Sequence, residues 1–321
     1  ASMQDKLSLF SDMVVFSAYA VQVVIAFMML TIIFIILPRA TVCARRINEV
    51  LDTKLSILDG QKDVSDISLR GEIKFKNVSF KYKDAKEYAL KNISFTAHKG
   101  EIVAFIGSTG SGKSTLINLI PRLYDTTSGE VLVDGINVKE YSKKDLNNKL
   151  GYVPQRAILF SGTVLSNVAY GIDETGDEIL EKVKKSISVA QGTDFIENMK
   201  NTYNGNIAEG GTNVSGGQKQ RLNIARAIYK NPEIYIFDDS FSALDYKTDR
   251  NLRLELKKQT VDATNIIVAQ RIGTIKNADK IIVLDEGEIV GMGTHKELLK
   301  TCKVYREIAY SQLSKEELGD E

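Results

Sequence analysis

The sequence predicts an α/β fold with a largely parallel sheet, preceded by one helix long enough to cross a membrane. The sheet is predicted because short apolar segments alternate with segments of helical periodicity from residue 73 onward, a pattern typical of parallel α/β cores. The membrane helix is predicted because residues 13–38 contain no Asp, Glu, Lys or Arg. With 321 residues, the chain has room for one large domain and an extra segment, or for two domains.

The apolar segment from Met13 to Pro38 exceeds the roughly 20 residues that a helix needs to cross the hydrocarbon core of a bilayer. A signal peptide would open with a basic region and end in small residues, whereas this chain opens with Asp5 and Lys6 and the segment ends in bulky residues. A buried core helix is the other alternative, and the length of the segment favours a membrane span. Three arginines follow at once: Arg39, Arg45 and Arg46. By the positive-inside rule, they place this end of the span in the cytoplasm.

The helix is expected to continue to about Leu51, because residues 40–51 contain good helix formers and no Gly. One span followed by a whole cytoplasmic domain is unusual for a complete membrane protein, and the chain begins with Ala1, so we expect the C-terminal portion of a longer polypeptide. The expected parts are a membrane helix with its extension (residues 1–60), a polar linker (61–71), an α/β domain (72–313) and a solvated acidic tail (314–321).

Apolar segments and turn signals locate the elements of the domain. The expected strands are residues 73–82, 89–97, 102–106, 130–133, 234–237, 266–269 and 281–284, and the expected helices are residues 114–120, 178–191 and 216–229. Asp134 and Gly135 predict a hairpin turn after the strand at residues 130–133. No internal repeat is found.

Composition excludes several classes of protein. The formal net charge of +1 lacks the basic field that nucleic-acid binding needs, so no nucleic-acid partner is expected. Cys43 and Cys302 form no C-x-x-C pattern, which favours a reducing compartment over a disulfide framework or a metal site. His98 and His295 stand alone and are expected at the surface or in turns.

The segment from Gly107 to Ser114 matches the phosphate-loop pattern G-x-x-x-x-G-K-[ST] between an expected strand and an expected helix. The candidate site consists of Gly107, Ser108, Thr109, Gly110, Ser111, Gly112, Lys113, Ser114 and the following Thr115. The glycines let backbone N–H groups surround a phosphate, Lys113 reaches the β- and γ-phosphates, and the Ser114 hydroxyl ligates Mg²⁺. A chance glycine-rich turn is the alternative, and the strand–loop–helix context counts against it. The chain is therefore expected to bind a nucleoside triphosphate.

An acid for the same metal ion is expected at the end of a later strand. Asp238 ends the apolar segment at residues 234–237, and a phosphate-loop NTPase needs such a carboxylate to hold Mg²⁺. A strand that ends in Asp is weak evidence alone, because turns often begin that way. Together with the segment from Gly107 to Ser114, it is strong.

A second glycine-containing helix start follows farther along the chain. Ser215, Gly216, Gly217 and Gln218 stand where a serine can cap a helix and bare N–H groups can hold an anion. Alone, this pattern is an ordinary helix cap. With the first phosphate loop, it makes the chain resemble the ATP-binding cassette (ABC) family, in which Ser-Gly-Gly-Gln is the signature motif. Val214 stands where the family usually has Leu, a mild departure.

The resemblance covers nearly the whole chain and implies a P-loop NTPase core with a helical subdomain, an antiparallel β subdomain, and ATP and Mg²⁺ as cofactors. It implies that Tyr82 stacks on adenine, and that Gln155 contacts Mg²⁺ or water and senses the membrane domain. Residues 242–245 resemble the loop that crosses the dimer interface, and residues 208–211 the loop that faces the partner's membrane helices. Residues 1–60 are similar to the last membrane helix of a multidrug- or lipid-type exporter half.

Two positions depart from the family pattern. The family usually places a water-polarising Glu after the strand-end Asp and a γ-phosphate-binding His later, whereas this chain has Asp239 and Gln270. The Asp side chain is one methylene shorter, and misplacement on that scale costs about 10²-fold in rate. Gln cannot carry charge or exchange a proton as imidazole does. Tolerated drift is the alternative, but two changes in one site favour slow hydrolysis and resemble the degenerate half of heterodimeric exporters.

The resemblance thus implies an ATP-driven exporter half in the plasma membrane. Its expected partners are a second exporter half, the lipid bilayer and a small, amphipathic substrate. A non-transport ATPase, such as a DNA-repair cassette protein, is an alternative that the apolar segment at residues 13–38 counts against. A regulatory subunit that binds nucleotide without hydrolysing it is a third possibility, which Asp239 and Gln270 leave open.

Overall fold

A computed structural model of the chain describes residues 3–62, 69–171 and 178–313. It separates into two compact units, an N-terminal unit (residues 1–58) and a C-terminal unit (residues 59–321). The acidic tail expected at residues 314–321 and residues 63–68 of the expected linker lie outside the described residues.

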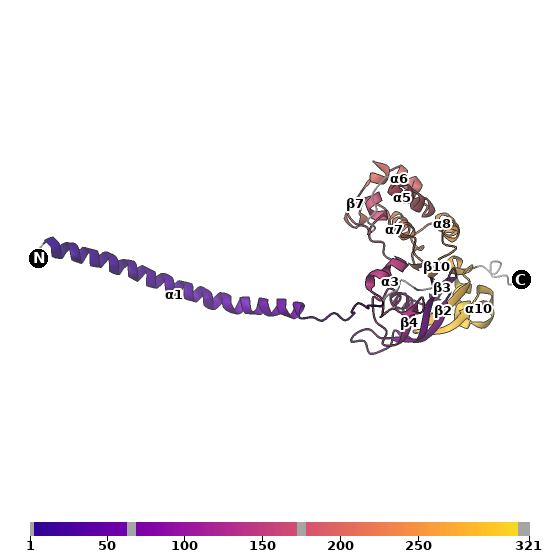
Figure 1. Ribbon diagram of the computed structural model, residues 1–321, viewed down its shortest axis with the longest axis horizontal. Helices are drawn as coiled ribbons and strands as arrows, with labels where there is room; N and C mark the ends of the chain where they lie inside the picture. The colour runs from indigo at the N-terminus through magenta and orange to yellow at the C-terminus, as the bar shows by residue number, and fades with distance from the viewer. Residues whose placement is uncertain (1–2, 63–68, 172–177, 314–321) are drawn as a thin grey trace. The chain divides into compact units, whose positions relative to one another are not determined.

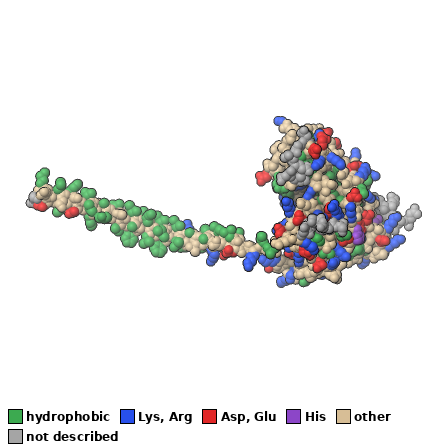
Figure 2. All heavy atoms as spheres, in the orientation of Figure 1, with side chains coloured by type: hydrophobic (Ala, Val, Ile, Leu, Met, Phe, Trp, Pro, Cys, Tyr) green, Lys and Arg blue, Asp and Glu red, His purple; other side chains and the backbone are tan. Residues whose placement is uncertain are grey.

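The N-terminal unit is dominated by one helix, α1 (Met3–Leu51), which continues through Pro38. Its C-terminal end agrees with the expected continuation to Leu51. Hydrophobic side chains cover its middle, and basic side chains appear near its C-terminal end (Figure 2). The most apolar window of α1 has a mean hydropathy of 2.9, and none of that window is buried by the protein. By length and composition, α1 is able to cross a membrane.

A six-stranded sheet forms the centre of the C-terminal unit. In spatial order its strands are β12 (Glu288–Gly293), β11 (Lys280–Asp285), β3 (Ile102–Gly107), β10 (Thr264–Val268), β9 (Ile234–Asp238) and β6 (Leu150–Val153). All neighbouring pairs are parallel except β11 and β12, whose antiparallel pairing closes one edge. The mixed α/β fold with a largely parallel core is therefore confirmed.

Two further sheets complete the unit. An antiparallel sheet contains β2 (Leu90–Ala97), β1 (Ile73–Phe80), β4 (Ser128–Val133) and β5 (Ile136–Asn137), and a small one contains β7 (Gly162–Thr163) and β8 (Asn206–Ile207). The turn predicted between β4 and β5 is present: Asp134 and Gly135 have φ angles of 51° and 77°. Positive φ at both central residues matches the twist of a two-residue hairpin.

Helices surround the sheets. They are α2 (Lys113–Asn118), α3 (Lys143–Lys149), α4 (Val164–Val168), α5 (Glu178–Val189), α6 (Thr193–Glu197), α7 (Gly216–Lys230), α8 (Tyr246–Gln259), α9 (Ile272–Ile275), α10 (His295–Thr301) and α11 (Lys303–Gln312), with 3₁₀ turns η1 (Thr202–Asn204) and η2 (Glu209–Gly211). Figure 1 shows α5, α6 and α7 gathered at one end of the unit and β2, β4 and α10 at the other. The first group is the helical subdomain that the sequence resemblance implied.

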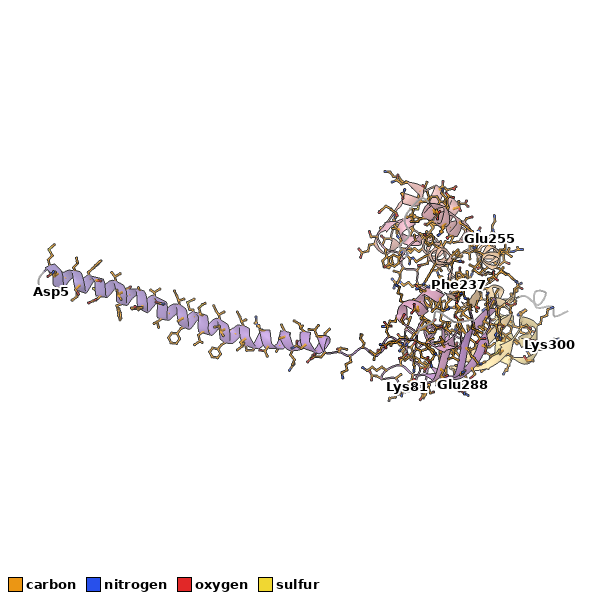
Figure 3. All side chains as sticks on the ribbon, in the orientation of Figure 1. Asp5, Lys81, Phe237, Glu255, Glu288 and Lys300 are labelled. Carbon is orange, nitrogen blue, oxygen red and sulfur yellow. The ribbon has the colours of Figure 1, made fainter. Side chains whose placement is uncertain are left out.

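Two hydrophobic cores lie on the two faces of the six-stranded sheet. Successive residues of β10 alternate between them, with Ile266 in the core shared with the antiparallel sheet and Ile267 in the core shared with the helical subdomain. This alternation is the two-residue period of a strand that is buried on both faces. Figure 3 shows Phe237 of β9 in the middle of the unit among packed side chains.

The C-terminal unit begins at residue 59 with backbone contacts of its own. The backbone N–H of Gly60 donates a hydrogen bond to the carbonyl oxygen of Tyr141 at 2.9 Å, and that of Lys62 donates one to the carbonyl oxygen of Glu140 at 3.1 Å. Asp59 accepts a hydrogen bond from the N–H of Lys143 at 2.9 Å. Residues 59–62 are therefore packed against the start of α3 instead of extending freely from the domain.

Candidate nucleotide-binding site

The phosphate loop joins β3 to α2, as the sequence predicts. Gly112, immediately before α2, has a φ of 97°, and a Cβ atom at this position would lie 2.8 Å from the carbonyl oxygen of Ala89. A Cβ on Gly107 would lie 2.0 Å from the carbonyl oxygen of Leu284. Close backbone approach therefore requires glycine at both ends of the loop.

Lys113 directs its ammonium group back into the loop. Its Nζ donates to the carbonyl oxygens of Gly107 and Ser108 at 2.9 and 2.7 Å, and to Ser111 Oγ at 3.3 Å. Burial lowers the pKa of Lys113, while the nearby carboxylates of Asp238 and Asp239 oppose that shift. A half-buried cation enclosed by loop carbonyls is well placed to meet an anionic phosphate chain.

Ser114 and Asp238 meet although they are far apart in the sequence. Ser114 Oγ donates to Asp238 Oδ1 at 3.0 Å, and Asp238 is 6% exposed at the end of β9. Burial is the largest influence on Asp238 and raises its pKa, while the hydrogen bond from Ser114 favours the charged form. A hydroxyl and a carboxylate at this separation are hard oxygen ligands that fit Mg²⁺.

Asp239, Gln155 and Gln270 also meet at the carboxyl ends of the strands. Asp239 Oδ2 accepts hydrogen bonds from Gln270 Nε2 at 3.0 Å and from Gln155 Nε2 at 3.3 Å. Asp239 itself has a φ of 45°, in the left-handed region. Burial raises the pKa of its carboxyl group, and neighbouring hydrogen bonds and the charge of Arg271 oppose the shift. The structure thus brings the three candidate catalytic side chains together, because the amides of Gln155 and Gln270 both donate to one oxygen of Asp239.

Tyr82 stands beside the phosphate-loop helix. Its hydroxyl lies 2.9 Å from Thr115 Oγ1, and its ring packs edge-on against Phe80 and Tyr124 at 4.8 and 5.3 Å between centroids. Tyr82 is 37% exposed, so these neighbours cover its ring only in part. Sequence reasoning missed Tyr124, which lies in a loop without any motif, and only the folded chain shows that it supports Tyr82.

Sequence reasoning also missed Tyr152 as a neighbour of Asp238. Its hydroxyl donates to Asn118 Oδ1 at 3.0 Å, and burial beside Asp238 raises its pKa above the usual range. Tyr152 therefore stays neutral and links β6 to the phosphate-loop helix. The sequence showed it only as part of the segment that contains Gln155, and no spacing signal links it to Asp238.

The signature segment forms an exposed helix start. Ser215 Oγ accepts the N–H of Gln218 at 3.3 Å, and Gln218 Oε1 accepts the N–H of Ser215 at 2.8 Å, so the two residues form a capping box on α7. Ser215 and Gly216 are exposed. Gly217 lies close to the backbone of Ala243, in the segment that ends with Asp245 capping α8. The described hydrogen bonds of Ser215 stay within its own cap, and none joins it to the phosphate loop of this chain.

The loop at residues 208–211 includes the 3₁₀ turn η2, with φ angles of 62° and 66° at Gly210 and Gly211. Asn213 Oδ1 accepts the N–H of Ala208 at 2.9 Å and closes this loop beside the signature segment. The isolated histidines lie elsewhere: His98 is exposed near Glu72, and His295 Nδ1 lies 2.7 Å from the hydroxyl of Tyr305.

A phosphate loop after a central strand, with a buried acid at the end of a second parallel strand hydrogen-bonded to the loop serine, is the arrangement of a P-loop NTPase. Residues 90–242 match the family model described as ABC transporter. The chain carries an ABC transporter ATP-binding domain, which is an ATPase domain.

Known proteins agree with this assignment. An uncharacterized ABC transporter ATP-binding protein of Mycobacterium bovis is 45% identical over 303 residues, which cover 94% of this chain and 52% of the relative. An ATP-dependent lipid A-core flippase of Ralstonia nicotianae is 38% identical over 84% of this chain and 45% of the relative. The solved structure of a bacterial Atm1-family ABC exporter with ATP bound matches with a TM-score of 0.80 and 32% identity, over 87% of this chain and 48% of that chain. The chain thus spans about half the length of the relatives it matches.

Proposed function

We propose that this chain is the ATP-binding and ATP-hydrolysing part of an ABC exporter half, and that its own nucleotide site turns over slowly within a heterodimer. The family assignment supports ATP as the nucleotide. The observation that carries the slow-site proposal is the contact of Gln155 and Gln270 with the same oxygen of Asp239.

Asp239 is poorly arranged to activate water. Its Oδ2 already accepts two amide N–H groups, and the side chain is shorter than the Glu that the family usually places here. The N–H of Gln270 that points at Asp239 is not available to a γ-phosphate at the same time. Both features reduce the stabilisation of the transition state for hydrolysis.

When bound, Mg²⁺ would supply charge neutralisation on the phosphate chain. Ser114 Oγ and Asp238 Oδ1 would hold the ion, and Gln155 would complete that side of the site directly or through water. Lys113 would bind the phosphates, and Tyr82 would position the adenine by stacking.

The exposed cap at Ser215 supports a two-chain arrangement. An intact signature segment whose Ser215 forms no described hydrogen bond with this chain's phosphate loop is suited to a nucleotide held by another chain. In this proposal the partner is a second exporter half, and Ser215 and Gly216 complete the fast site there. A regulatory subunit that binds ATP without hydrolysing it is the second candidate, favoured by the same Asp239 and Gln270.

The transport role rests on α1 and on the named relatives. A 49-residue helix with a long apolar middle and basic residues near its end fits a span of the plasma membrane that enters the cytoplasm at the C-terminal unit. The proposed substrate is a small, amphipathic molecule moved outward across the bilayer, and the name of the flippase relative, whose substrate is a lipid, supports its amphipathic character.

The test is single-turnover hydrolysis of Mg²⁺-ATP by the purified full chain in lipid nanodiscs, with protein in excess so that a second copy supplies the signature segment. Asp239→Glu combined with Gln270→His is expected to raise the rate by about 10²-fold, because the water-orienting acid and the γ-phosphate contact both return. The control is Asp239→Asn with Gln270→His, which restores the imidazole without an acid and is expected to stay slow. Equal rates for the two double variants would contradict the slow-site proposal. ATP binding without measurable turnover, even in the restored variant, would favour the regulatory alternative.

A further inference from the structure

The C-terminal unit contains a cavity of about 760 Å³ that the nucleotide chemistry does not use. Ile102 of β3 and Asn265 and Ile267 of β10 form its floor, and α8, α9 and the residues that follow α9 form its walls. Its volume lies within the usual range for sites that hold a small organic ligand.

The cavity is distinct from the nucleotide site. Asn265 pairs with Ile102 near the amino ends of the parallel strands β10 and β3. The phosphate loop, by contrast, follows the carboxyl end of β3 at Gly107. A ligand in contact with Asn265 would therefore lie toward the opposite edge of the sheet from a bound nucleotide.

All of the charged side chains that line the cavity are cationic. Four cationic side chains line it, and none of its described lining residues is Asp or Glu. The cations are Arg250, Arg253, Lys257 and Lys276. This composition selects an anionic ligand.

Arg253 forms hydrogen bonds that hold the cavity walls together, whereas the other three cations are available to a ligand. Its guanidinium binds both carboxylate oxygens of Asp249 at 2.9 Å and donates to the carbonyl oxygens of Gly273 and Thr274 at 3.2 Å. These bonds tie α8 to α9 and keep the two walls in place. Within the described chain, the other three cations form no ion pair: Arg250, Lys257 and Lys276.

The floor carries a buried acceptor without a donor. Asn265 is 3% exposed, and its Nδ2 donates to Thr260 Oγ1 and to the carbonyl oxygen of Ala263 at 3.1 and 3.0 Å. Its Oδ1 accepts no hydrogen bond from any described residue. A buried acceptor left unpaired costs free energy. Because this oxygen has less than 1 Å² of accessible surface, a ligand that donates an N–H or O–H group to it gains affinity only as the floor beside Asn265 opens on binding.

The remaining lining is apolar. Ile102 and Ile267 on the floor and Leu254 and Ala278 on the walls offer aliphatic surface between the acceptor and the cations. On α8, Leu254 lies on the same face as Arg250 and Lys257, at helical spacing. One wall therefore presents both an apolar surface and cationic heads.

We propose that this cavity binds a small organic anion with an apolar or aromatic body and one hydrogen-bond donor. The donor meets Asn265 Oδ1, the body packs on the aliphatic lining, and the anionic group binds among Arg250, Lys257 and Lys276. This site goes beyond the proposed transport function, because it requires neither a nucleotide nor the partner chain.

The experiment uses indole-3-acetate, which has one carboxylate, an aromatic body and one N–H donor. The chain contains no Trp, so indole fluorescence excited beyond the tyrosine band reports the probe alone. The full chain in phosphatidylcholine nanodiscs is titrated against empty nanodiscs. Saturable binding with a Kd at or below about 1 mM is expected for a ligand of this size, and its absence would overturn the proposal.

Two related probes test the two polar contacts without altering the protein. Indole-3-acetamide lacks the negative charge, and 1-methylindole-3-acetate lacks the N–H donor. Each is expected to bind about tenfold more weakly, because one polar contact is lost. Equal affinity for the acetate and the acetamide would overturn the anion assignment, and equal affinity for the methylated probe would overturn the role of Asn265.

Variants locate the site. Arg250→Gln with Lys257→Gln is expected to weaken indole-3-acetate at least about tenfold. Lys247→Gln with Lys258→Gln removes the same charge from α8 at residues outside the cavity and is expected to leave binding unchanged. If the two double variants weakened indole-3-acetate binding equally, the probe would not be bound in this cavity. Saturating ATP is expected not to displace the probe, and displacement would place the probe in the adenine site and overturn the proposal while leaving ATP binding itself intact.

Discussion

Lys113 shows at the scale of one residue how the phosphate loop keeps its shape. Its ammonium group binds the carbonyl oxygens of Gly107 and Ser108, so the cation is held where a phosphate chain would lie. We expect Lys113→Ala to abolish high-affinity ATP binding, because the point charge on the β- and γ-phosphates is lost. Photolabelling with radioactive azido-ATP measures the loss. Lys99→Ala, an exposed lysine outside the loop, is the control, and equal labelling of both variants would remove Lys113 from the site.

Tyr82 allows the ring and the hydroxyl to be separated. Tyr82→Ala is expected to weaken ATP binding by about 1–3 kcal/mol, the range for an aromatic–base stack. Tyr82→Phe loses only the contact with Thr115 Oγ1 and is expected to bind nearly as the parent does. Equilibrium binding of a fluorescent ATP analogue distinguishes them.

The control for the adenine contact is Tyr88→Ala. Tyr88 is a nearby exposed tyrosine whose ring lies 5.9 Å from Lys81 Nζ. It is expected to leave ATP affinity unchanged. A large loss in Tyr82→Phe would mean that the hydroxyl, and not the stack, holds the nucleotide.

The sequence revealed individual motifs but not their contacts. Gly107 to Ser114 could be read directly, because a local pattern determines both the loop and its chemistry. The convergence of Gln155, Asp239 and Gln270 on one oxygen depends on parallel pairing between strands that are far apart in the chain. No spacing rule in a single sequence supplies that pairing, so the shared hydrogen bonds on Asp239 could not be predicted.

At the scale of elements, periodicity predicted four of the six strands of the central sheet (β3, β9, β10 and β11) with small differences at their ends, and it missed β6 and β12. The strand expected at 266–269 is Thr264–Val268, because Thr264 and Asn265 pair with β9 despite their polarity. Tertiary hydrogen bonds thus override the apolar pattern at that boundary. The packing of residues 59–62 on the start of α3 could not be seen either, because their composition is typical of a linker.

The turn between β4 and β5 is anchored by a buried ion pair. Lys149 Nζ lies 2.7 Å from Asp134 Oδ2 and 2.9 Å from Glu233 Oε2, and the Lys149 and Asp134 side chains are 15% and 0% exposed. Lys149→Met leaves a buried carboxylate unpaired and is expected to destabilise the C-terminal unit by about 3–5 kcal/mol. For a domain of this size, that corresponds to a fall in Tm of roughly 6–20 °C, measured by circular dichroism of the full chain.

A matched pair on the surface tests whether burial is the cause. Lys258 lies at the same 2.7 Å from Glu255, but both side chains are exposed. Lys258→Met is expected to change stability by less than about 0.5 kcal/mol, because water screens the pair. Similar losses for the two variants would show that ion-pair distance alone, and not burial, sets the stability of the turn.

At the scale of the whole molecule, the proposed exporter needs two chains, and the capped start of α7 is where this chain would act on the other. Ser215→Arg is expected to abolish most ATPase activity of the assembled heterodimer, because a bulky side chain at the helix start prevents approach to the partner's nucleotide. ATP binding at this chain's own Lys113 is expected to stay intact, since the described contacts of Ser215 do not reach the phosphate loop. The control is Ser188→Arg, which introduces the same side chain on the exposed surface of α5, away from the expected interface. Ser242→Arg is less suitable, because the loop at residues 242–245 is also expected at the interface.

Steady-state ATPase activity and azido-ATP labelling are measured on the same samples. Robust turnover by the chain without any partner, unchanged by Ser215→Arg, would show that its own site does the hydrolysis and would overturn the heterodimer proposal.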